Sequence, residues 1–155
     1  MLTRREAVTV GLGAPLLASA CRGDVKWTRR AYRKPASSRV AIVRAAAYGP
    51  KLVDEVLAGL RLLGVTAQNR RVVLKPNLVE FDPGGAINTH PAVVAAAVGA
   101  FRRLGAREVV VAEGPGHRRD TEYLLTASGL HAVLRDLEVR YVDLNRAAVT
   151  PVELG

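Results

Sequence analysis

Cysteine is nearly absent from this sequence, since Cys21 is the only one among 155 residues. A single cysteine excludes a disulfide within the chain, an iron–sulfur cluster held by four cysteines and a zinc finger built on CxxC pairs. Any metal ion bound here would be coordinated by oxygen and nitrogen ligands. The cofactor is unknown at this point, a divalent metal ion is one candidate, and no iron–sulfur cluster is expected.

Several catalytic signatures are missing as well. The chain has no Ser-His-Asp order, no catalytic cysteine and no paired carboxylates at helical spacing, so the corresponding hydrolase mechanisms are unsupported. The turn Gly114-Pro115-Gly116 lacks both the GxGxxG spacing of dinucleotide folds and the GK[ST] ending of a P-loop. It supports only a tight turn that lets the backbone approach a ligand.

The composition is that of one globular domain, with 49% hydrophobic and 24% charged residues. The formal net charge is +9, which would ordinarily suggest nucleic acid as a partner. However, 19 of the 23 basic residues are arginines scattered along the chain, a bias that genome base composition can produce. We therefore expect no specific nucleic-acid partner.

The first residues resemble an export signal. Arg4 and Arg5 precede an uncharged run over residues 7–20, which has the length of a signal-peptide core and is too short to span a membrane. The arginine pair resembles a twin-arginine signal, and the small residues before Cys21 resemble a lipoprotein cleavage box. We expect residues 1–20 to be removed and Cys21 to be lipidated; the alternative is a buried N-terminal helix.

Residues 21–38 combine several cations with little apolar periodicity and are predicted to be a basic tether. Such a segment can rest on anionic lipid head groups beside an acyl anchor, or it can be a plain solvated linker. The expected location is outside the cytoplasm, membrane-anchored, and either periplasmic or on the cell surface. The expected membrane partner is engaged through the N-terminal lipid anchor.

Apolar runs alternate with helical patterns from Arg39 onward. We predict strands over residues 40–44, 71–75, 108–112 and 139–143. We predict helices over residues 50–64, 90–104 and 120–129, with Asn88-Thr89 as the N-cap of the second and a short further helix over 131–137. This order predicts an α/β domain over residues 39–155, with a parallel sheet of about four strands and helices on both faces.

Ligands of open parallel sheets bind beyond the carboxyl ends of the strands. Polar residues that follow those ends are therefore the candidate site. Lys75 and the start of the 90–104 helix are suited to hold a phosphate or carboxylate, and Glu113 or His117 to act as acid or base. The candidate ligand-binding residues are Lys75, Thr89, His90, Gly114 and Gly116, and the candidate catalytic residues are Glu113 and His117.

Most of these residues also have a simpler structural interpretation. Lys75 is suited to a solvent-facing position, Thr89 to capping the helix, and His90 to the surface at a helix start. Glu113 directly follows the most apolar strand, where burial disfavours a charged carboxylate unless a cation such as Lys75 or a metal lies opposite.

A metal site is one further hypothesis for the loop after residue 112. Glu113, His117 and Asp120 lie within eight residues and offer ligands for a hard or borderline divalent ion. Three such groups also occur by chance in a loop, and Arg118 and Arg119 oppose a cation there.

Four sequence blocks occur in order: LKPNLVE, INTHP, FRRLGA and VVVAEGPGHRRDTEYLL. They closely resemble the bacterial and archaeal family called domain of unknown function 362 (DUF362). The resemblance implies a family without an agreed reaction, whose members often carry an export signal. It also implies a ligand role for Asn77, which after Pro76 would otherwise indicate a turn. The family's domain is longer than the stretch after Leu74, so we expect it to continue beyond Gly155.

Two functional hypotheses from different classes follow. In the first, the chain is an exported enzyme that acts on a small anionic substrate at the carboxyl edge of the sheet. In the second, it is a periplasmic or surface module that binds a ligand or metal without catalysis. We favour the enzyme, because groups capable of proton transfer are predicted to lie together at that edge.

Overall fold

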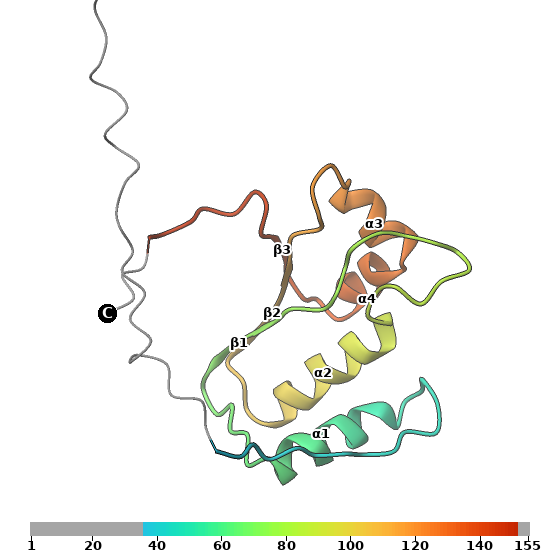
Figure 1. Ribbon diagram of the computed structural model, residues 1–155. Coiled ribbons are helices and arrows are strands. Elements are labelled where there is room, and N and C mark those ends of the chain that lie inside the picture. Colours follow the sequence, from blue (N-terminus) through green and yellow to red (C-terminus); the bar gives the residue numbers. More distant parts are fainter. Residues whose placement is uncertain (1–35, 152–155) are drawn as a thin grey trace, which may run out of the picture. The chain divides into compact units, whose positions relative to one another are not determined.

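The computed structural model of the protein describes residues 36–151 (Figure 1). The predicted export signal, nearly all of the basic tether and Cys21 lie outside the described residues. The elements are α1 (Leu52–Leu62), β1 (Arg71–Leu74), α2 (Pro91–Arg103), β2 (Glu108–Glu113), α3 (Thr121–Ala127), α4 (Leu130–Asp136) and β3 (Tyr141–Asp143). Within residues 36–151, no helix has the length and apolar character needed to cross a membrane.

The three strands form one parallel sheet in the order β1-β2-β3. Arg71 pairs with Glu108 at the start of β1, and Glu113 pairs with Asp143 at the end of β2 and β3. The prediction of an α/β fold with a parallel sheet is confirmed, because α2 carries the chain from β1 back to the start of β2.

The core lies on the face of β2 that presents Val109 and Val111. Because side chains alternate along a strand, these two residues point to the same side. They pack with buried residues of α2 and α4, namely Val94, Val98, Leu130 and Leu134. Val98 and Val111 are fully buried.

The described crossover helices therefore share one face of the sheet, whereas we expected helices on both faces. The physical reason is the strand order. Right-handed crossovers between strands that are added in sequence all fall on the same side, and coverage of both faces needs a reversal of that order. The described strands run in one direction, β1 to β2 to β3, without such a reversal.

The predicted strand over residues 40–44 is wrong, since these residues form no ladder with β1. The segment lies instead along α1: the Arg39 guanidinium donates to the Leu63 carbonyl at 3.0 Å, and Val43 lies against Gly59. Val40 and Ile42 remain 78% and 88% exposed. Their β-branched side chains produced the strand signal, but such a propensity stabilises a strand only where neighbouring side chains pack against it.

The ends of α2 follow from local sequence, with one difference from expectation. His90, rather than Asn88 or Thr89, is the N-cap: its Nδ1 accepts a hydrogen bond from the Ala92 N–H at 3.1 Å. Pro91 occupies the first helical position, where its missing N–H costs nothing. After the C-cap Leu104, Gly105 adopts φ 79°, a left-handed conformation that favours glycine.

Candidate functional site

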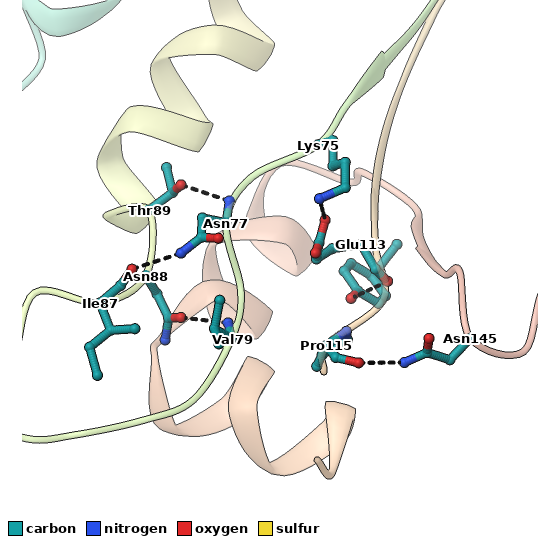
Figure 2. Close-up of polar contacts among 10 residues, drawn as sticks. Lys75, Asn77, Val79, Ile87, Asn88, Thr89, Glu113, Pro115 and Asn145 are labelled. Carbon is teal, nitrogen blue, oxygen red and sulfur yellow. Dashed lines mark hydrogen bonds and ion pairs between the residues drawn. The ribbon is translucent and has the colours of Figure 1, made fainter. Parts of the chain in front are cut away.

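Lys75 and Glu113 come together at the carboxyl edge of the sheet, as the parallel arrangement predicts. Lys75 follows β1 and Glu113 ends β2, and the Lys75 Nζ forms an ion pair with the Glu113 Oε2 (Figure 2). The two partners differ sharply in exposure, because the side chain of Lys75 is 64% exposed and that of Glu113 only 8%. The edge thus presents an accessible amine backed by a buried carboxylate.

Glu113 is the one buried charged residue of the described core. Its Oε2 is paired with the Lys75 ammonium group, which supplies its charge compensation, and no other hydrogen-bond partner is found for it among residues 36–151. A buried charge is costly unless it is paired and hydrogen-bonded. The buried Glu113 carboxylate therefore depends on Lys75 for charge compensation.

The backbone around Glu113 is held firmly. Its carbonyl oxygen accepts hydrogen bonds from the Tyr141 hydroxyl at 2.9 Å and from the Leu144 N–H at 3.0 Å. Burial of the ring, together with the negative charges of Asp143 and Glu113, raises the pKa of Tyr141 to about 12. The Tyr141 phenol therefore stays a hydrogen-bond donor over the physiological pH range.

Gly114 lets two loops approach each other. A Cβ atom at this position would lie 2.8 Å from the Asn145 Oδ1 and 3.2 Å from the Asn145 backbone nitrogen. Asn145 in turn donates from Nδ2 to the Pro115 carbonyl at 2.8 Å (Figure 2). Gly116 has no atom within 4 Å of such a Cβ. Of the two glycines expected to admit a ligand, Gly114 admits a protein loop and Gly116 faces open space.

Asn77 and Thr89 also come together, but their polar groups bind each other and the backbone (Figure 2). The Thr89 hydroxyl oxygen accepts from the Asn77 N–H at 2.9 Å, and the Thr89 N–H donates to the Asn77 carbonyl at 2.9 Å. The Asn77 side-chain amide donates to the Ile87 carbonyl at 2.8 Å. Both side chains hold the loop between β1 and α2.

Asn88 strengthens the same contact. Its Oδ1 accepts from the Val79 N–H and its Nδ2 donates to the Glu80 carbonyl, each at 2.8 Å. We name this set of contacts between residues 77–80 and 87–89 the loop clasp. It replaces strand pairing where Pro76 has ended β1.

His90 combines capping with an aromatic contact. Because its Nδ1 accepts from the Ala92 N–H, the ring proton of the neutral imidazole lies on Nε2. The ring stacks on Tyr48 with centroids 4.0 Å apart and an interplanar angle of 2°. Neither contact brings His90 to Glu113.

The residues considered for a metal site do not assemble into one. His117 is exposed, and Asp120 serves as the N-cap of α3 by accepting from the Tyr123 N–H at 3.0 Å. Within residues 36–151 there is no group of three or more His, Cys, Asp or Glu side chains placed to hold a metal ion.

A cavity lies beside Lys75 and Thr89, and neither Glu113 nor Asn77 lines it. Its volume is about 200 Å³, and it lies between the end of β1 and the first turns of α2. Lys75 lines it from one side and Thr89 from the other. The edge thus offers space for a small molecule beside the exposed amine.

Three residues that hold this edge together were not among the candidates. The sequence predicts Asn88 as part of a helix N-cap and Tyr141 as part of a strand, and Asn145 follows the predicted strand over residues 139–143. Asn145 had the clearest signal, since it follows the end of β3 just as Lys75 follows β1.

Comparison with known proteins identifies the family. The DUF362 family, described as a domain of unknown function, matches residues 72–155. This stretch contains β2, β3, all of β1 except Arg71, and both partners of the Lys75–Glu113 pair. No curated protein and no solved structure matches the chain. Since the match covers more than half of the sequence, the chain belongs to the DUF362 family.

Proposed function

We propose that this protein is an enzyme that binds a small anionic substrate at the carboxyl edge of the sheet, with Lys75 holding the anion and Glu113 transferring a proton. The observation that carries the proposal is the Lys75–Glu113 pair, in which an exposed amine meets a carboxylate that is almost fully buried. Lysine is a compact point charge suited to phosphate and carboxylate groups.

The exposure of Lys75 supports its role in binding. An ammonium group has three N–H donors, and the side chain is 64% exposed, so donors remain accessible beside the pair. The adjoining cavity of about 200 Å³ is large enough for a small anion and is otherwise lined mainly by apolar atoms. An apolar wall strengthens the attraction between an anion and the amine.

Glu113 suits proton transfer because its carboxylate is buried and, among the described residues, is compensated by Lys75. When an anion draws Lys75 away, Glu113 loses its compensating charge. A substrate hydroxyl or a protonated group on the ligand would then be the natural partner of the carboxylate.

Ligand binding without catalysis is the second candidate. It is favoured by the loop clasp, which engages the side chains of Asn77 and Thr89 and so leaves fewer groups to assist a reaction. On this account the Lys75–Glu113 pair is a switchable ion pair that opens for an anion and closes in its absence.

Isothermal titration with inorganic phosphate and with acetate tests the anion site in the full chain. We expect binding to the wild type that weakens about tenfold or more in Lys75→Ala, the loss typical of one charge-assisted contact. Arg71→Ala is a matched control that removes a β1 cation paired with Glu108. Phosphate binding that survives Lys75→Ala unchanged would contradict the proposal and leave the start of α2 as the anion site.

Glu113→Gln separates the enzyme from the binding module. Glutamine keeps the size of the side chain but cannot exchange a proton. An enzyme would lose turnover of an anionic substrate at similar affinity, whereas a binding module would keep its affinity and have no turnover to lose. Unchanged turnover in Glu113→Gln would remove this residue from the reaction.

A further inference from the structure

A second and larger cavity lies on the other side of the loop clasp. Its volume is about 510 Å³, within the range of roughly 300–1,000 Å³ that is usual for small-molecule sites. Four segments form its walls: Tyr48 before α1, the loop over residues 80–88, the start of α2 with His90, and Ser128 between α3 and α4. The proposed anion site does not use this space.

Aromatic rings line this cavity. Tyr48 lies flat on His90, which is itself fixed as the N-cap of α2. Phe81 lies edge-on to Tyr123 with ring centroids 6.4 Å apart. Tyr48 is 64% exposed and Phe81 37% exposed, so both rings offer free surface to a ligand. Ring faces of this kind attract flat apolar groups and cations.

The charge of the lining has one sign. Glu80 and Asp82 line the cavity, and no lysine or arginine does so among the described residues. Glu80 is already paired with Arg119 at 2.6 Å. Asp82 accepts from the Gly84 N–H at 3.0 Å through Oδ1 and has no ion-pair partner in residues 36–151. Its negative charge is therefore available to a ligand.

We propose that this cavity binds a small aromatic cation, a flat ring that carries an ammonium or amidinium group. The ring would lie against Tyr48 and Phe81, and the cationic group would meet the Asp82 carboxylate. An anion is disfavoured here because the Asp82 carboxylate would repel it. The cavity thus selects a charge opposite to that selected by Lys75, although Thr89 and Val93 line both cavities.

Three probes separate the contributions in the full chain: benzamidinium, benzoate and acetamidinium. Benzoate shares the ring of benzamidinium but reverses the charge, and acetamidinium shares the charge but lacks the ring. Titration followed by NMR is expected to show benzamidinium binding at least about tenfold tighter than either of the other two. Equal binding of benzoate, equal binding of acetamidinium, or no binding of benzamidinium would each overturn the proposal.

Two variants locate the bound probe. Asp82→Asn removes the charge but keeps the acceptor for the Gly84 N–H, and Tyr48→Ala removes an exposed ring. Each is expected to weaken benzamidinium binding by about three- to tenfold. Asp54→Asn is the control. It removes a carboxylate of α1 that is paired with Arg103 of α2, and it should leave the affinity unchanged. Affinity that is unchanged in both Asp82→Asn and Tyr48→Ala would overturn the proposal.

Discussion

Two glycines of the same turn have very different surroundings. Gly114 faces the backbone and side chain of Asn145 at less than normal contact distance for a Cβ atom, whereas Gly116 faces open space. We expect Gly114→Ala to lower the free energy of unfolding by about 1–3 kcal/mol, the usual cost of overpacking. Gly116→Ala is the matched control and should change it by less than about 0.5 kcal/mol. Urea denaturation measures both, and equal effects would contradict the close approach of the two loops.

Tyr141 should ionise only at strongly alkaline pH. Its pKa is raised from 10.0 to about 12 because the phenolate is disfavoured by burial and by Asp143 and Glu113. A pKa that is higher in the folded than in the unfolded chain contributes stability that is fully present below pH 10 and is lost as the pH rises towards 12.

Absorbance titration at alkaline pH tests this expectation. The wild type should show a late transition from Tyr141, and Tyr141→Phe should lack it while losing the hydrogen bond to the Glu113 carbonyl. The chain has four tyrosines, so one missing late transition is readily distinguished. An unchanged alkaline curve in Tyr141→Phe would contradict the assigned environment.

At the level of single residues, the sequence predicts the meeting of Lys75 and Glu113 but not the engagement of Asn77 and Thr89. The first depends only on strand direction, because neighbouring parallel strands end at the same edge. The second depends on the path of the loop over residues 80–87, which brings Ile87 and Thr89 back to Asn77. Local sequence patterns do not specify such a path.

Among the elements, the loop between β1 and α2 depends on the loop clasp for its shape. Asn88→Ala removes two hydrogen bonds to the backbone. The Val79 N–H and the Glu80 carbonyl then have only water as a hydrogen-bond partner. We expect a loss of about 1–2 kcal/mol in unfolding free energy and faster proteolysis within residues 81–87. Asn69→Ala, a change in the loop before β1, should not accelerate cleavage there. Unchanged proteolysis in Asn88→Ala would show that the clasp does not hold the loop.

Sequence patterns predict the helices correctly but mispredict the segment over residues 40–44 as a strand. The helices α1, α2 and α3 lie within the predicted ranges, because capping residues and spacings of three and four are local signals. The segment over residues 40–44 has the same β-branched composition as β2, yet it packs along α1 with Val40 and Ile42 exposed. A strand needs a partner, and composition alone does not say whether one is present.

For the whole molecule, export remains a prediction from the first residues of the sequence. The arginine pair, the short apolar run and the small residues before Cys21 occur in the order of a lipoprotein signal. We expect the mature protein to begin at a lipidated Cys21 and to sediment with membranes. Cys21→Ser should release it from the membrane. Mass spectrometry measures the N-terminus, and an intact Met1 on soluble protein would contradict export.

The central claim is that the carboxyl edge of the sheet binds an anion through Lys75, and NMR of the lysine side chains tests it most directly. The chain has only four lysines, so Lys75→Arg identifies the signal of Lys75 by its disappearance, and Lys51 provides a control from the described part of the chain. On titration with inorganic phosphate, the Lys75 methylene signals should shift with saturation while those of Lys51 stay in place. A Lys75 signal that does not move while the amides of residues 88–90 and Ala92 shift would contradict the account.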